Sequence, residues 1–299
     1  MADRTFCICW NWEHDAGFIR LLEAACASRG LGLIQVTPAN LADSIRQLRE
    51  GWLTFHGLLD RASDTDERFL EVVEWASDRG VYRINPYERA RLQWDKAAVH
   101  IVLSHATHTP RTIILPPFDR VPELPPLDLA PLGESFCIKP AQGGGGDGVV
   151  VGATTLDEVV ASRQEFAADR YLLQSMVRPA DLNGRPGWFR VVHFTGRVFP
   201  FWWNPETHVY APVTAEEEAG FGLGPLRSVS ASIAWVCGLE LFSSEIARTH
   251  DGLFVAVDYV NDPVDLRLRS ETPDGVPDET VAELAAGLAD LVRGGGPPL

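Results

Sequence analysis

One stretch of the sequence, residues 135–151, combines a single lysine with five closely spaced glycines. Residues typical of a β-strand precede the glycines, and the β-branched run 149–151 follows them. Backbone without Cβ atoms can approach a phosphate closely and direct its N–H groups toward it, and a nearby lysine adds a positive charge. We therefore expect this stretch to bind phosphate groups. The residues concerned are Lys139, Gly143, Gly144, Gly145, Gly146 and Gly148.

The glycine spacing has to be distinguished from two well-known phosphate loops. Gly143, Gly145 and Gly148 satisfy G-x-G-x-x-G, but a dinucleotide-binding loop requires a helix immediately after it, and here a β-branched run follows. A Walker loop requires Gly-Lys-Ser or Gly-Lys-Thr at its end, and no lysine follows these glycines. The pattern predicts a strand–loop–strand hairpin that lies over a nucleotide as a mobile flap. A surface hairpin without a ligand is the alternative.

A second group of residues has the chemistry of a metal site. Glu245 and Asp258 lie on two strands that we expect at 239–246 and 253–260, and Asn261 follows the second strand. Two neighbouring carboxylates repel each other unless a cation lies between them. Carboxylate and amide oxygens suit Mg²⁺, which completes its coordination with water and phosphate oxygens. The pattern predicts a magnesium site, and two solvent-exposed strand positions are the alternative.

The charge composition limits the class of ligand. The net charge of −15 argues against a surface that binds nucleic acid or an anionic membrane. A phosphate ligand must therefore be held by a local group of cations. Of the 26 basic residues only Lys96 and Lys139 are lysines, and one of them lies on the strand before the glycines. We take both lysines as phosphate ligands, with a compositional bias toward arginine as the alternative.

The remaining composition is that of an ordinary soluble protein. No apolar run reaches the roughly 18 residues that a membrane helix needs, and the N-terminal residues lack the features of a secretory signal. The five cysteines occur without the spacing of a zinc site. We expect a cytoplasmic protein with reduced thiols, and both a monomer and a homodimer are compatible with the sequence.

Strands and helices alternate along the first 92 residues. Such alternation is typical of a parallel sheet with helices on both faces, and ligands bind at the carboxyl ends of its strands. The expected strands are 5–10, 31–36, 53–59 and 81–84, and the expected helices are 15–28, 41–48 and 64–75. The residues expected at the ligand-binding rim are Trp10, Asn11, Trp12, His14, Asp60 and Arg61.

The rest of the chain predicts an α+β arrangement without internal repeats. A helix is expected at 93–106, a proline-rich connector at 116–131 and a β-hairpin at 188–203. Further strands are expected at 111–115 and 171–176, and further helices at 156–166, 225–237 and 277–293.

Taken together, these motifs resemble the ATP-grasp superfamily over essentially the whole chain. The similar segments are Asp95-Lys96, Ile138–Pro140 with the glycine loop, Leu172–Val177, Arg190, Ser244–Ala247 and Val257–Asn261. Their order is more specific than any one of them. The resemblance implies an α/β ATP-grasp fold in three parts: a Rossmann-like substrate domain at 1–92, a small ATP-binding subdomain at 93–173, and a catalytic Mg²⁺-binding subdomain at 174–299.

The resemblance also implies roles for individual residues. Lys96 and Lys139 would contact the phosphates of ATP, and Arg190 would face the transferred phosphoryl group. The chain departs from the family's pattern in two places. The metal set is Asp258-x-x-Asn261 instead of an acid-x-Asn pair, and in the hinge a serine follows the glutamine. The implied adenine-binding hinge is Gln174, Ser175, Met176 and Val177, and the implied ligands of Mg²⁺, or of Mn²⁺ in its place, are Glu245, Asp258 and Asn261.

The implied reaction is transfer of the γ-phosphoryl of ATP to a carboxylate, followed by attack of an amine on the acyl phosphate. An amino-acid-like substrate would contact Asn11, His14 and Arg61, with Arg267 as a further catalytic residue. The size and arginine-rich composition resemble those of ligases in antibiotic biosynthesis, which favours closure of a ring within one substrate. Ligation of two amino acids, a small-molecule kinase and a nucleotide-binding regulator are the alternatives.

Overall fold

The N-terminal part of the chain forms a parallel sheet, as predicted. The computed structural model describes residues 4–296. Its first four strands are all parallel and lie in the order β2-β1-β3-β4. They are β1 (Thr5–Trp10), β2 (Gly32–Val36), β3 (Gly57–Arg61) and β4 (Tyr82–Ile84).

Helices cover both faces of this sheet. Alternate residues of β1 point to opposite sides, so Phe6 and Ile8 pack in one core and Cys7 and Cys9 in another. The first core contains α1 (Ala16–Ala27) and α9 (Asp278–Gly294), and the second contains α2 (Leu41–Glu50) and α3 (Leu70–Asp78). All five cysteines are free.

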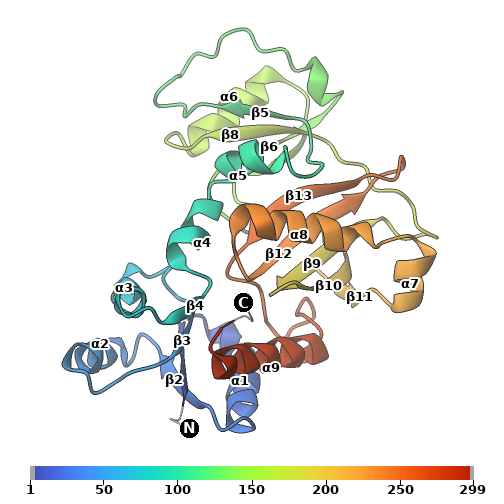
Figure 1. The fold of residues 1–299 in the computed structure, drawn as a ribbon. Coiled ribbons are helices and arrows are strands. Elements are labelled where there is room, and N and C mark those ends of the chain that lie inside the picture. The colour runs from blue at the N-terminus through green and yellow to red at the C-terminus, as the bar shows by residue number, and fades with distance from the viewer. Residues whose placement is uncertain (1–3, 297–299) are drawn as a thin grey trace.

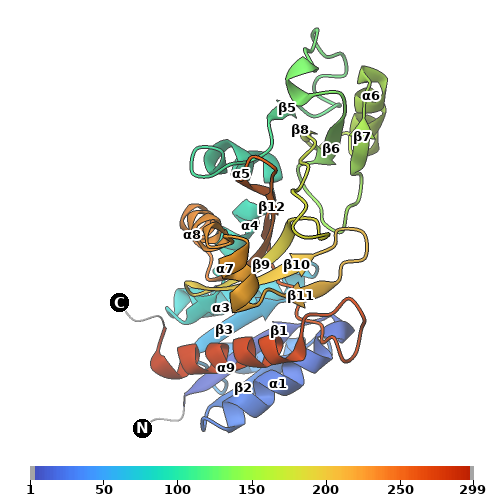
Figure 2. The same cartoon turned by 90° about the vertical axis from the view of Figure 1, so that its right-hand side faces the viewer.

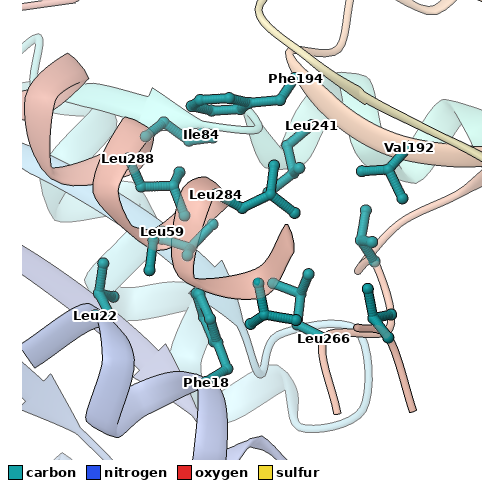
Figure 3. Close-up of a cluster of buried hydrophobic side chains, with 14 of the residues drawn as sticks. Phe18, Leu22, Leu59, Ile84, Val192, Phe194, Leu241, Leu266, Leu284 and Leu288 are labelled. Carbon is teal, nitrogen blue, oxygen red and sulfur yellow. The ribbon is translucent and has the colours of Figure 1, made fainter. Parts of the chain in front are cut away.

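The last helix returns to the first part of the chain. Figures 1 and 2 show α9 lying alongside α1, far from it in sequence. Leu284 and Leu288 of α9 meet Phe18 and Leu22 of α1 in a core that also includes Phe194 of the C-terminal sheet (Figure 3). The division of the chain into domains at residues 92 and 173 stays a prediction. Residues 278–294, which form α9, help to cover one face of the N-terminal sheet.

A five-stranded antiparallel sheet forms the C-terminal part. Its order is β11-β10-β9-β12-β13, and α8 (Pro225–Cys237) covers one face. The three-residue β11 and the short α7 (Ala215–Gly220) were not predicted, because the first is too short to show a period and the second buries no residue. The strands are β9 (Trp188–Phe194), β10 (Arg197–Trp203), β11 (Tyr210–Pro212), β12 (Leu241–Arg248) and β13 (Phe254–Asn261).

A smaller antiparallel sheet carries the glycine loop. Its order is β5-β8-β6-β7, and α6 (Leu156–Glu165) packs against it. In Figure 1 this sheet lies at the opposite end of the molecule from α1 and α2. Its strands are β5 (Thr112–Leu115), β6 (Phe136–Pro140), β7 (Val150–Ala153) and β8 (Tyr171–Ser175). The predicted strand–glycine loop–strand hairpin is confirmed by the antiparallel pairing of β6 with β7.

Some predicted boundaries are wrong. The helix expected at 93–106 is α5 (Lys96–Leu103), which begins after Asp95 because the side chain of Asp95 accepts two backbone N–H bonds. The preceding helix α4 (Tyr87–Gln93) was not predicted. The strand expected at 53–59 is β3, which places Asp60 and Arg61 at the end of the strand instead of after it. No helix within residues 4–296 is long and apolar enough to cross a membrane.

Candidate active site

The two predicted metal carboxylates lie side by side. Glu245 on β12 is directly opposite Asp258 on β13. The next residue on each strand, Ile246 and Tyr259, packs in the core beneath α8, so both carboxylates project from the other face. Burial raises the pKa of Glu245, an effect that Arg190 opposes and the charge of Asp258 reinforces. The pair is therefore electrostatically strained unless a cation joins it.

Arg190 is fixed beside this pair. It lies opposite Glu245 on the neighbouring strand β9, and its Nη1 donates to Glu245 Oε1 at 2.7 Å. Its Nε and Nη2 donate to the hydroxyl of Ser243 at 3.2 and 3.1 Å. The guanidinium also lies 4.9 Å from the ring centre of Trp203. These contacts hold a permanent positive charge in one orientation at the carboxylates.

The two lysines reach the site from different elements. In β6 the side chains of Phe136 and Ile138 are buried under α6, so Lys139 projects from the other face. Its Nζ lies 3.5 Å from the carbonyl oxygen of Val257, the residue before Asp258, and its charge opposes the rise in the pKa of Glu245. The small sheet and the five-stranded sheet therefore meet at Lys139.

Lys96 contacts the glycine loop itself. Its Nζ donates to the carbonyl of Gly143, and its backbone N–H donates to Ala141 O at 2.8 Å. Within the loop, Gly148 has φ +68° and a Cβ there would lie 2.5 Å from the ring of Phe166, so only glycine fits. The two lysines thus flank the loop from α5 and β6. Phosphate binding by the loop and its closure over a nucleotide stay predictions.

The donor set fits a magnesium ion. Asn261 lies opposite Ser243 and donates its Nδ2 to the carbonyl of Ser243 at 3.3 Å, which leaves the amide oxygen to coordinate. Among residues 4–296 no three His, Cys, Asp or Glu side chains form a metal cluster. Two carboxylates and one amide are a small set, so Mg²⁺ would draw its other ligands from water and from ATP phosphate oxygens.

The predicted adenine hinge is only partly available to a ligand. Gln174 is buried in the middle of the small sheet, paired with strands on both sides, and its Nε2 donates to Thr112 Oγ1 and to Tyr259 Oη. Both its backbone and its side chain are used internally, and a contact between Gln174 and ATP stays a prediction. Ser175 N–H donates to Arg111 O and its hydroxyl accepts from Arg111 N–H. Met176 and Val177 follow the strand, are half-buried, and stay predicted adenine contacts.

Arg61, a predicted substrate contact, is engaged inside the protein. It is 5% exposed, and it binds both carboxylate oxygens of Asp15 at 2.7 and 2.8 Å. Its Nη1 donates to the carbonyl of Val264 at 2.9 Å. With every terminal nitrogen engaged inside the protein, the guanidinium joins α1 and β3 to the chain after β13.

The other predicted substrate contacts lie near the rim of the parallel sheet. Asn11 donates to Thr65 Oγ1 and Ala62 O, which fixes the loop after β3. His14 is exposed and packs edge-on against Trp12. Both stay predicted substrate contacts, and His14 is the more exposed of the two.

Arg267 is held by carboxylates of its own segment. It forms ion pairs with Asp265 at 2.7 Å and Asp274 at 2.9 Å, and it lies 5.7 Å from the ring centre of Trp12. The hydrogen bonds that Arg267 donates to Asp265 raise the pKa of Arg267 above its usual range. A substrate carboxylate would have to displace one of these partners, and the catalytic role of Arg267 stays a prediction.

The rim itself is acidic. Asp60, Asp64 and Asp262 line one small cavity together with Asn85, whose Nδ2 donates to Asp262 Oδ1 at 2.8 Å. Burial raises the pKa of all three carboxyl groups, that of Asp262 to about 7. Arg61, which was expected at this rim, points inward, and the rim carries carboxyl groups instead.

Sequence reasoning missed three residues that surround Arg190. Ser243 could have been found from its position two residues before Glu245 on the same strand. Trp203 lies on β10 and pairs with Tyr210 on β11, the strand that was not predicted. Burial raises the pKa of Tyr210 to about 12, with Arg190 opposing the rise, so its hydroxyl stays protonated at neutral pH.

The architecture agrees with solved structures, although no family model and no curated protein matches the sequence. A RimK-domain ATP-grasp protein from Sphaerobacter thermophilus has a TM-score of 0.65 at 21% identity, with 96% of this chain and 99% of that one covered. The structure of D-cycloserine synthetase DcsG has a TM-score of 0.58 at 16% identity, with 96% of this chain and 99% of that one covered. The ATP complex of D-alanine–D-alanine ligase from Bacillus anthracis has a TM-score of 0.66 at 13% identity, with 97% of this chain and 99% of that one covered. The chain therefore has the ATP-grasp fold, as the resemblance implied.

Proposed function

We propose that this protein is an ATP- and Mg²⁺-dependent carbon–nitrogen ligase. It would phosphorylate a substrate carboxylate and join the resulting acyl phosphate to an amine, with release of ADP and phosphate. The observation that carries the proposal is the meeting of Lys139 from the small sheet with the Glu245–Asp258 pair of the five-stranded sheet. The fold shared with several ATP-grasp ligases supports it.

Each residue of the site has a part in this chemistry. Lys96, Lys139 and the glycine loop would hold the phosphates, and Arg190 would face the transferred phosphoryl group. Phosphoryl transfer depends mainly on positioning and on neutralising charge, so no covalent residue is needed. Bound Mg²⁺ would supply further charge neutralisation, held by Glu245, Asp258 and Asn261. Mn²⁺ accepts the same oxygen ligands and would substitute.

The substrate that we propose is a small amino-acid-like molecule. The most specific form of the proposal is ring closure of O-ureido-D-serine to D-cycloserine, a step of antibiotic biosynthesis. In it the substrate's own carboxylate is phosphorylated, the nitrogen bonded to the side-chain oxygen attacks and displaces phosphate, and the carbamoyl group on that nitrogen is lost by hydrolysis as carbon dioxide and ammonia. The similarity to D-cycloserine synthetase supports this form. A cytoplasmic location is in keeping with five cysteines that form no disulfide.

Ligation of two separate amino acids is the second candidate. It is favoured by the similarity to D-alanine–D-alanine ligase, whose TM-score of 0.66 exceeds the 0.58 of the D-cycloserine synthetase structure. A cyclo-ligase makes its product from one substrate, whereas a dipeptide ligase needs two. A kinase on the same fold would instead release a stable phosphorylated product without a new C–N bond.

One experiment tests the proposal and separates these forms. The purified protein is incubated with ATP and a panel of D- and L-amino acids that includes O-ureido-D-serine, with and without Mg²⁺. We expect ADP release that depends on both substrate and metal, and mass spectrometry identifies the product. Lys139→Ala should abolish this release in a folded protein. ADP release that is equally fast in Lys139→Ala would refute the assignment of the site.

A further inference from the structure

A histidine on the loop between β10 and β11 lies next to the active site and was not assigned a role. His208 is exposed, and its imidazole stacks on the indole of Trp203 with ring centres 5.4 Å apart and planes 3° apart. Trp203 is also the ring over which the guanidinium of Arg190 lies. The imidazole therefore shares an aromatic support with the arginine that binds Glu245.

The backbone of this loop is built to hold the histidine in place. The side chain of Asn204 accepts the backbone N–H of Glu206 at 2.8 Å and of Thr207 at 3.1 Å. His208 N–H then donates to Asn204 O at 2.8 Å, and His208 adopts φ +57°. A left-handed conformation is uncommon for a residue other than glycine and is maintained only where the surroundings enforce it.

The ring of Trp203 places His208 beside the site. The imidazole of His208 and the guanidinium of Arg190 both contact this ring, and Arg190 in turn binds Glu245. The groups that face this region from β9, β11 and β12 are Arg190, Tyr210 and Glu245. Arg190 stays charged, Tyr210 stays protonated, and Glu245 is engaged by Arg190, so none of the three is suited to accept a proton at neutral pH.

Two other histidines, His193 on β9 and His100 on α5, are buried and already have partners. His193 is buried on the face beneath α8, with Nδ1 3.0 Å from Ser230 Oγ and Nε2 accepting from Gly196 N–H. His100 is buried against Tyr259 Oη at 2.7 Å. By contrast, no hydrogen bond to the ring nitrogens of His208 occurs among residues 4–296, so its imidazole is available to a proton donor.

We propose that His208 is the general base of the ligation step, a role that rests on the proposed function. The nucleophilic nitrogen attacks the acyl carbon, the new C–N bond forms, and the C–O bond to phosphate breaks. The phosphate leaves with the bonding electrons. The imidazole of His208 accepts the proton that the nitrogen loses and then releases it to solvent.

The test separates formation of the acyl phosphate from its use. His208→Asn removes the imidazole while keeping a residue type that tolerates φ +57°. The variant is assayed with the amino-acid panel in two ways: formation of the C–N product, and formation of hydroxamate when hydroxylamine is added. Hydroxylamine is a reactive neutral nucleophile at neutral pH and captures an acyl phosphate without a protein base. The exposed His105, at the far end of α5 from Lys96, gives the matched control His105→Gln.

The expected result is a split between the two assays. General bases contribute about 10²- to 10⁴-fold, so ligation should fall by at least roughly 10²-fold in His208→Asn while hydroxamate formation stays at the level of the unmodified protein. Ligation that is unchanged, or hydroxamate that falls in parallel with it, overturns the role of His208 and leaves the proposed function standing. Absence of hydroxamate from the unmodified protein refutes the acyl phosphate chemistry and His208 with it.

Discussion

Glu245 and Asp258 lie directly opposite each other on the β12–β13 ladder, and Arg190 on β9 binds the first of them. Like charges in such a position destabilise a sheet unless they are neutralised. Arg190 engages only one of the two carboxylates, which leaves oxygen atoms of the pair for a divalent cation. The repulsion between the two carboxylates, which destabilises the sheet without a metal ion, therefore favours binding of the cation.

The first prediction concerns this repulsion. Asp258→Asn keeps the shape of the side chain and removes one of the two like charges, so the protein without metal should be at least as stable as the unmodified one. Bound Mg²⁺ at 100 times its Kd would add about 2.7 kcal/mol to the unmodified protein, and this gain should vanish in the variant together with ADP release. Thermal unfolding with and without Mg²⁺ measures it. The exposed Glu279→Gln should keep the full response.

The second prediction concerns the two lysines. Each would make a charge-assisted hydrogen bond to phosphate, worth about 1.5–3 kcal/mol, so Lys139→Gln and Lys96→Gln should each raise the KM for ATP roughly 10- to 100-fold. Because Lys96 also binds Gly143, its variant alone should increase proteolysis within the glycine loop. Arg46→Gln, in an exposed ion pair on α2, is the control for loss of a positive charge. An unaltered KM for ATP in both lysine variants would contradict the assignment.

The third prediction is that Arg190→Lys fails although it keeps the charge. A single ammonium cannot reproduce the planar set of bonds to Glu245 and Ser243 or the contact with Trp203. We expect kcat to fall on the order of 10²- to 10³-fold with little change in the KM for ATP. Steady-state kinetics and near-UV circular dichroism together check this result. A lysine variant with normal kcat would show that only the charge matters.

The fourth prediction concerns stability instead of activity. Arg61→Met leaves the buried carboxylate of Asp15 without its partner, which should cost about 3–5 kcal/mol in the free energy of unfolding. The double variant with Asp15→Asn should recover part of this loss, since no unpaired charge then remains. Urea unfolding measures both. If Arg61 were a substrate ligand after all, the single variant would keep its stability and raise the KM for the acceptor.

The fifth prediction concerns pH. Burial lowers the pKa of His193 to about 4, whereas the unfolded chain has the ordinary value of 6.5. Between these two values the unfolded state binds more protons, so the free energy of unfolding falls as the pH is lowered and reaches its full value only above 6.5. Complete protonation would cost about 3 kcal/mol. Urea midpoints at pH 5 and 7.5 should therefore differ more in the unmodified protein than in His193→Gln. Equal differences would show that His193 is solvated.

Local pattern was sufficient for most elements and for the chemistry of the site. The alternation of strands and helices predicted the parallel sheet, because the periods of 2 and 3.6 residues are visible within short windows. The glycine loop, its lysine and the two acids were recognisable because each needs a particular residue type. The helix α4 was not predicted, since it has seven residues and buries only Ala90, which is too little to show an apolar period.

Tertiary structure alone decided which of the polar candidates work together. Arg61 and Asp15 lie 46 residues apart, and only the packing of α1 on β3 shows that they neutralise each other instead of facing a substrate. The strand register sets Glu245 against Asp258 and Arg190, and the approach of two sheets brings Lys139 to Val257. The sequence by itself determined the residues able to bind phosphate and metal. Which side chains are free for a ligand depends on long-range partners, and these exist only once the chain has folded.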